Sequence, residues 1–180
     1  MKNLFVFILM ILLLGCTPEN PTPNPTFTIG QSYQGGKIAY IDDSGLHGLI
    51  AAPSDQTTGS PGAQWGCFGT ALSGADGLII GTGNQNTIDI MNGCSEPGIA
   101  ARLCGDLVLG GYSDWYLPSL DELNQLYVNR VAIGGFAFNS YWSSTEFNTD
   151  SAWRQYFFNG SQYFYDGKNN LTNVRAVRAF

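Results

Sequence analysis

The chain has 180 residues, with 8 Lys and Arg against 14 Asp and Glu, a formal charge of −6 and a sequence pI near 4.4. Nucleic acids and anionic lipid headgroups require clustered Lys and Arg, so this composition excludes them as partners. Hydrophobic residues make up 44% of the sequence and 23 residues are Gly, which predicts one compact, loop-rich domain with a substantial core.

Residues 1–16 are predicted to be a lipoprotein signal peptide. Lys2 is followed by an apolar run over residues 4–14, too short to span a membrane, that ends in Leu-Leu-Gly-Cys. This tetrad resembles the bacterial lipobox, so we expect cleavage before Cys16 and lipidation of that residue with acyl chains such as palmitate. The alternative is an ordinary secretory signal with an incidental Cys. Loss of Lys2 leaves 7 basic and 14 acidic side chains and a mature charge near −7.

Residues 17–32 are predicted to be a Pro-rich tether, because half of the 8 prolines lie between residues 18 and 25 and no apolar periodicity accompanies them. At about 3.1 Å per residue in a polyproline II conformation, residues 17–26 hold the domain up to about 30 Å from its lipid. We expect packed structure to begin near Phe27 and assign the domain to residues 33–180. The anchor places the protein on the outer membrane or cell surface rather than free in the periplasm.

The first half of the domain predicts a hairpin, a long loop and two helices. Residues 37–41 and 47–52 are strand-like and flank a turn at 42–45, and residues 54–77 are a Gly- and Ser-rich loop. Asn86 or Thr87 can cap a helix that ends near residue 92, and a second helix follows Pro97 and ends at residue 107 or 108.

The clearest helix start is at Ser119. Ser119 as N-cap and Glu122 at the third helical position form a capping box, and Leu residues at 120, 123 and 126 share one face with Tyr127. Beyond this helix, period-two segments predict strands at 141–145, 152–158, 161–166 and 174–180, with a type I′ turn at Asn159-Gly160. The fold class is therefore α+β, with short helices packed on antiparallel strands.

Cofactor, metal and catalytic motifs are weak. Gly81-Thr82-Gly83 lacks the third glycine of a dinucleotide fingerprint, and no βαβ unit follows it. His47 is the only histidine, and a triad with Asp43 and Ser44 would require neighbouring turn residues to converge. We therefore expect no cofactor, no metal and no enzymatic activity.

Three cysteines remain once Cys16 carries lipid, which in an oxidising compartment predicts one disulfide and one free thiol. Cys94 with Cys104 is the first choice because the Pro97-Gly98 turn between them allows a fold-back. Pairing of Cys67 with either of them is the alternative.

Several motifs occur together in one order. They are GLHGLI at 45–50, QWGC at 64–67, GTG at 81–83, NT at 86–87, AARLC at 100–104, GYSDWYLPS at 111–119, YWSSTE at 141–146 and VRAVRAF at 174–180. Together these segments, across about residues 33–180, resemble the C-terminal domain family of the Lcl collagen-like adhesin. The resemblance implies a C-type-lectin-like fold and a surface or periplasmic binding role.

Departures from related families limit what this resemblance implies. The calcium-dependent sugar site of C-type lectins uses a Glu-Pro-Asn or Gln-Pro-Asp motif, whereas this chain has Glu96-Pro97-Gly98. The sequence also lacks a collagen-like repeat and any counterpart of the cysteine pair of formylglycine-generating enzymes. Calcium-bridged sugar binding is therefore not supported.

Two groups of residues are assigned roles. One of Tyr141 and Trp142 should face inward, and at least one of the two arginines near the C-terminus should meet a carboxylate. We assign to the scaffold Trp115, Pro118, Ser119, Glu122, Trp142, Arg175 and Arg178. Exposed polar groups around an aromatic ring predict ligand contacts at Glu146, Asn148, Asp150 and Trp153.

The first functional hypothesis is a lipid-anchored, non-enzymatic envelope domain that binds a glycan or another extracellular polymer. The second is a structural component of a cell-surface assembly that contacts envelope proteins and has no small ligand. The third is an exported hydrolase or modifying enzyme.

Overall fold

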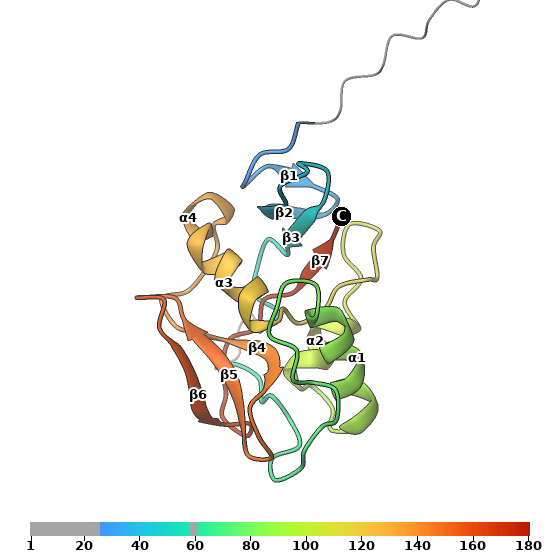
Figure 1. Cartoon of the computed structure of the whole chain (residues 1–180), viewed down its shortest axis with the longest axis vertical. Helices are drawn as coiled ribbons and strands as arrows, with labels where there is room; N and C mark the ends of the chain where they lie inside the picture. Colours follow the sequence, from blue (N-terminus) through green and yellow to red (C-terminus); the bar gives the residue numbers. More distant parts are fainter. Residues whose placement is uncertain (1–25, 58–60) are drawn as a thin grey trace, which may run out of the picture.

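Two antiparallel sheets and a set of short helices, connected by long loops, make up the computed structural model in Figure 1. The structure describes residues 26–57 and 61–180, so the signal peptide, Cys16 and residues 17–25 of the tether lie outside it. The predicted α+β class, with short helices on antiparallel strands, is confirmed. Within the described residues, no helix combines the length and apolar character that crossing a bilayer requires.

The first sheet joins the two ends of the domain. Its strand order is β1 (Ser32–Tyr33), β2 (Gly36–Ile41), β3 (Gly48–Ala51) and β7 (Val177–Ala179). The predicted hairpin is β2–β3, and its turn closes with a hydrogen bond from Gly45 N to Asp42 O of 3.0 Å.

Part of the segment assigned to the tether belongs to this sheet. The ring of Phe27 packs 5.0 Å from that of Tyr33 and 4.8 Å from that of Phe180, and Ile38 N donates to Gln31 O at 2.9 Å. The tether therefore ends before residue 27 and not at residue 32, because Phe27 already packs against Tyr33 and Phe180 of the domain.

The second sheet has the order β4 (Ser140–Glu146), β5 (Ser151–Tyr156) and β6 (Gln162–Gly167), as the period-two pattern predicted. The prediction of a type I′ turn at Asn159-Gly160 is wrong. Gly160 has φ of 82°, but Asn159 is not among the described non-glycine residues with positive φ. The turn is longer, and Asn159 Oδ1 instead accepts a hydrogen bond from Ser161 N at 3.0 Å.

The helices are α1 (Gly83–Gly93), α2 (Ala100–Gly105), α3 (Leu120–Val128) and α4 (Arg130–Ile133). The predicted start of α1 is wrong, because Asn86 and Thr87 lie inside the helix and are buried. Their side chains bind other segments, Asn86 Oδ1 accepting from Gly77 N at 3.1 Å and Thr87 Oγ1 from Leu117 N at 3.0 Å. The α3 start is confirmed.

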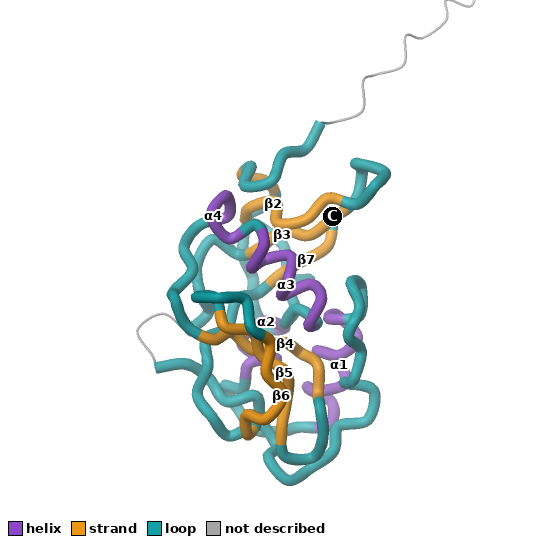
Figure 2. Tube along the Cα trace, turned by 60° about the vertical axis from the view of Figure 1, so that its left-hand side comes forward, coloured by secondary structure: helices purple, strands orange, loops and turns teal. Residues whose placement is uncertain are grey.

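Strand β4 lies between two hydrophobic cores. Trp142 belongs to the core beneath α1 and α2, whereas Tyr141 belongs to the core between the first sheet and α3. Both side chains are 0% exposed, so the expectation that only one faces inward is wrong. Alternate side chains of a strand point to opposite faces, and here each face meets a core. Figure 2 shows α3 running between the two sheets, where it contacts β2, β4 and β5.

Candidate functional site

A β-bulge in the second sheet gathers aromatic rings at its surface. The register of β5 and β6 shifts between Ala152 and Arg154, so that Phe164 and Tyr165 of β6 both lie opposite Trp153 of β5. A bulge of two residues against one bends the strand and re-aims its side chains. Neighbouring side chains that would otherwise point to opposite faces can therefore approach each other.

We name the resulting cluster of Phe147, Trp153, Phe164 and Tyr165 the aromatic platform. The ring of Phe164 is central, with centroid distances of 4.4 Å to Phe147, 4.9 Å to Trp153 and 3.9 Å to Tyr165. Tyr165 is 79% exposed and Phe147 is 46% exposed. Because exposed aromatic patches are typical of interaction surfaces, we treat this cluster as the candidate binding site.

The loop between β4 and β5 borders the platform and carries Asn148 and Asp150. Asn148 Oδ1 organises the loop by accepting hydrogen bonds from Asp150 N, Ser151 N and Ser151 Oγ, at 2.9, 2.9 and 2.8 Å. Both Asn148 and Asp150 are exposed. Three of the four predicted ligand contacts, Asn148, Asp150 and Trp153, thus lie at or beside the platform.

Glu146 is not an exposed ligand contact, so its assignment is corrected. Its carboxylate forms an ion pair with Lys168, whose side chain is 0% exposed, and accepts a hydrogen bond of 2.9 Å from Leu72 N. Lys168 Nζ also donates to Thr70 O at 2.8 Å and lies 4.8 Å from the Trp65 ring centroid. Because a buried ammonium requires a charged partner, the carboxylate of Glu146 serves as the counter-ion of Lys168 and does not face solvent as a ligand contact.

The capping box is built as predicted and extends into a buried network. Glu122 N donates to Ser119 Oγ at 3.3 Å, and Ser119 N donates to Glu122 Oε2 at 2.8 Å. Glu122 Oε1 accepts from Gly81 N at 2.8 Å and from Tyr116 Oη at 3.2 Å. Burial raises the pKa of Glu122, against the effect of these hydrogen bonds, and burial also raises the pKa of Tyr116.

The other scaffold residues before α3 and on β4 are also interior. Trp115 is 2% exposed and its indole N–H donates to Leu109 O at 3.3 Å. Pro118 is buried and its carbonyl accepts from Ser144 N at 2.7 Å. The indole N–H of Trp142 donates to Ala63 O at 2.9 Å, so both indoles are satisfied.

Both arginines near the C-terminus meet carboxylates. Arg178 Nε and Nη2 donate to the two oxygens of Asp114 at 2.7 and 2.8 Å, and these hydrogen bonds lower the pKa of Asp114. Arg175 is fully buried and its Nε donates to Asp55 Oδ1 at 2.8 Å. These residues hold distant segments together, as their scaffold assignment predicted.

The disulfide joins Cys67 to Cys94, with Cα atoms 5.8 Å apart, so the first-choice pairing of Cys94 with Cys104 is wrong. Cys104 is a free, fully buried thiol on α2, and burial raises its pKa. α2 turns Cys104 into the core, while the loop carrying Cys67 returns to the end of α1. Glu96 lies within 4.8 Å of the two bonded sulfurs, but a disulfide offers no thiolate to a metal ion.

His47 and its neighbours form a turn in which the hydroxyl of Ser44 binds Asp42. Asp42 Oδ1 accepts from Ser44 Oγ at 2.6 Å and from His47 N at 3.4 Å, and the hydrogen bond from Ser44 lowers the pKa of Asp42. The His47 side chain is exposed. This geometry agrees with the turn that the sequence predicted.

Sequence reasoning missed Phe147, Phe164 and Tyr165 as members of the platform. The available signal was the run Tyr163-Phe164-Tyr165 in a strand at the edge of a sheet. Because successive side chains of a strand point to opposite faces, these three rings cannot all lie on one buried face. The bulge that brings two of them to one face has no sequence signature in this chain.

Comparisons with known proteins show a family and a structural similarity. A family model described as "Lcl C-terminal domain" matches residues 70–178. A solved structure of a fimbrial protein from Bacteroides ovatus ATCC 8483 is similar with a TM-score of 0.44 and 16% sequence identity, over 72% of this chain. The chain spans only 35% of the length of that fimbrial protein. No curated protein matches the sequence.

Proposed function

Because the chain belongs to the Lcl C-terminal domain family, we propose that it is a lipid-anchored binding domain of the cell envelope that recognises a glycan or another extracellular polymer. Family membership supports the coarser part of this proposal, a cell-surface, adhesin-like domain. The finer part, binding of a polymer, rests on one observation: the aromatic platform is exposed and built by a bulge.

The platform suits a carbohydrate because sugar rings present apolar C–H groups on their faces and hydroxyl groups at their edges. The ring faces of Tyr165 and Phe147 offer the apolar surface, and the exposed carboxylate of Asp150 and amide of Asn148 on the bordering loop offer hydrogen-bond partners. Several weak contacts along a polymer add through multivalency, so each single site need not bind tightly.

The charges around the platform favour a neutral glycan. The two cations of this sheet region are committed to carboxylates, Arg154 to Asp166 and Lys168 to Glu146. Among the residues that the structure describes, no other cation lies in this sheet region, so a sulfated or phosphorylated polymer would lack a charged partner there.

A glycan array with residues 26–180 tests the proposal, with Tyr165→Ala and Trp153→Ala as platform variants. Phe158→Ala is the matched control, because Phe158 is an aromatic residue of the β5–β6 turn that is 65% exposed and outside the platform. We expect reproducible binding to neutral glycans that both platform variants reduce at least about tenfold and the control leaves unchanged.

Other outcomes would support the other two hypotheses. An array without hits, together with capture of envelope proteins in pull-down experiments, would favour a structural component of a surface assembly. Turnover in a substrate screen would favour an exported enzyme. Binding that survives both platform substitutions would contradict the site assignment while leaving a glycan-binding role intact.

A further inference from the structure

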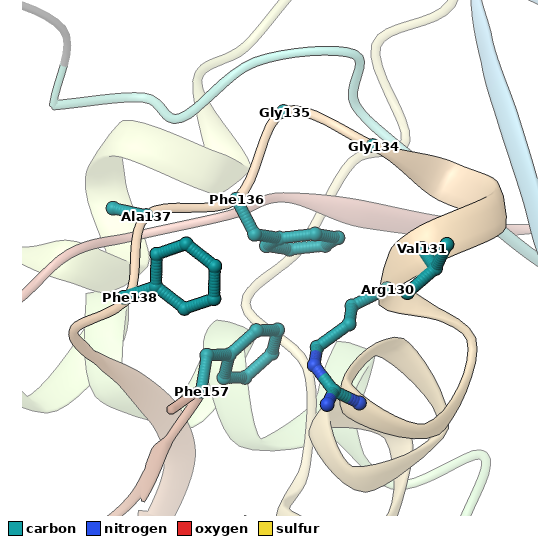
Figure 3. A pocket seen from close by; sticks show the side chains of 8 residues that line it. All are labelled: Arg130, Val131, Gly134, Gly135, Phe136, Ala137, Phe138 and Phe157. Carbon is teal, nitrogen blue, oxygen red and sulfur yellow. The ribbon is translucent and has the colours of Figure 1, made fainter. Parts of the chain in front are cut away.

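A pocket lies away from the platform, between α4 and the segment that leads into β4 (Figure 3). It encloses about 240 Å³. Figure 3 shows the rings of Phe136, Phe138 and Phe157 around one side of it, with Arg130 and Val131 across from them. The volume is smaller than that of sites for drug-sized ligands, which run from about 300 Å³ upward.

The wall of this pocket is held in place by a buried network. Ala137 N donates to Tyr141 Oη at 2.8 Å, and Tyr141 Oη donates to Asp55 Oδ2 at 2.8 Å. The same Asp55 accepts from Arg175, whose guanidinium also donates to the carbonyl of Gly135. Tyr141 and Arg175 are both 0% exposed. A wall fixed before binding does not lose conformational entropy when a ligand enters.

The network also fixes the central ring of the pocket. The guanidinium carbon of Arg175 lies 4.1 Å from the Phe136 ring centroid, and the Phe157 ring lies 4.8 Å from the same ring. Phe138, by contrast, is 79% exposed and forms an outer wall. The pocket therefore combines a rigid aromatic floor with one accessible aromatic side.

Arg130 differs from the other cations that hold the C-terminal half together. Lys168, Arg175 and Arg178 each bind a carboxylate. In residues 26–57 and 61–180, by contrast, Arg130 has no carboxylate within ion-pair distance. Its Nη1 donates to Tyr127 O at 2.8 Å, and its guanidinium stacks 4.1 Å from the Tyr127 ring centroid. A guanidinium has five N–H donors, so donors remain for an anion at the pocket rim.

From this arrangement we propose that the pocket binds a monocarboxylate that carries one aromatic ring, with the ring among the phenylalanines and the carboxylate on Arg130. The ring-lined volume sets the size of the apolar part, and the unpaired guanidinium sets the charge. Two sources share this chemistry, a free aromatic acid and the C-terminal aromatic residue of a polypeptide. The inference is independent of the glycan proposal, since the two sites share no residue.

The test is titration of the full chain, extracted in mild detergent, with 3-phenylpropionate and with its neutral isostere 3-phenylpropionamide. Binding is followed by calorimetry and by the NMR signals of the Gly134 and Gly135 amides. We expect saturable binding of the acid and at least about tenfold weaker binding of the amide, because a charge-assisted hydrogen bond is lost. A short peptide ending in Phe, with a free or an amidated terminus, distinguishes the two sources.

Three variants complete the test. Arg130→Gln and Phe138→Ala should each weaken binding of the acid at least about tenfold, while Lys37→Gln removes a positive charge elsewhere and should have no effect. Thermal unfolding identifies any variant that fails to fold, and Phe138→Ala removes only an exposed ring. Equal affinity for acid and amide, an unaffected Arg130→Gln variant, or the absence of binding would overturn the proposal. The chain could instead self-associate in a way that Phe138→Ala abolishes and that the acid does not inhibit. This result would assign the pocket to a second copy of the chain and would also overturn the proposal.

Discussion

Lys168 offers the sharpest test of how the loop between β3 and α1 is held. Its ammonium is fully buried between Thr70 O and the carboxylate of Glu146, which is itself only 10% exposed. Lys168→Met keeps the length of the apolar stem but removes the charge, and so leaves Glu146 as an uncompensated buried anion. Breaking one side of a buried ion pair costs about 3 to 5 kcal/mol, a large part of a total stability of about 5 to 15 kcal/mol.

Urea unfolding of residues 26–180 measures this cost. With a typical denaturant slope, we expect the midpoint to fall by about 2 M for Lys168→Met. Lys37→Met is the matched control, because Lys37 Nζ only contacts Ser32 Oγ, and its effect should stay within about 0.5 kcal/mol. The double variant Lys168→Met/Glu146→Gln should recover much of the loss, since a neutral amide needs no counter-charge. A single variant as stable as the wild type, or a double variant that shows no recovery, would refute the reasoning.

Four further outcomes follow from the sequence and the described geometry. Cys16→Ser should release the protein from membranes. A variant that still fractionates with membranes, together with a wild type on which mass spectrometry finds no acyl group, would exclude the anchor. Cys67→Ser should cost about 3 to 4 kcal/mol in urea unfolding, the value for a loop closed across 27 residues, and non-reducing peptide mapping should find its wild-type disulfide. Trp115→Ala should cost about 3 to 5 kcal/mol and Ser119→Ala about 1 kcal/mol; equal denaturant midpoints for the two would contradict the core role of the indole. Burial raises the pKa of Glu122 in the folded protein above 4.5, its value in the unfolded chain. The stability that the protonated carboxyl contributes is therefore present below pH 4.5 and is lost as pH rises through the pKa of the folded state. Glu122→Gln should remove this part of the pH dependence of unfolding.

Features set by neighbouring residues were predictable from the sequence. The capping box at Ser119 depends on groups three residues apart, and the β2–β3 hairpin depends on a local turn, so both follow from short-range chemistry. The start of α1 was misplaced because Asn86 and Thr87, good capping residues by type, instead satisfy backbone groups of other segments.

Features set by long-range packing were not predictable. Arg175 and Asp55 are separated by 120 positions, and nothing in the sequence pairs them. The disulfide depends on where the loop that carries Cys67 returns, which residue spacing does not determine. Likewise, Glu146 resembled an exposed carboxylate because its buried partner, Lys168, lies 22 positions away in the turn after β6. Three of the four predicted ligand contacts therefore lie on the same hairpin region as the aromatic platform, while the other members of the platform required the three-dimensional structure.

The position of Phe27 has a geometric consequence for how the molecule is displayed. Phe27 packs beside Phe180, so the chain enters the fold at the end formed by the first sheet. Figure 1 shows the loop that joins β4 to β5 toward the opposite end of the molecule. A lipid at Cys16, as we propose, would then join the domain at the end opposite this loop. Lengthening or shortening the tether would then change how far this end of the domain reaches into the medium.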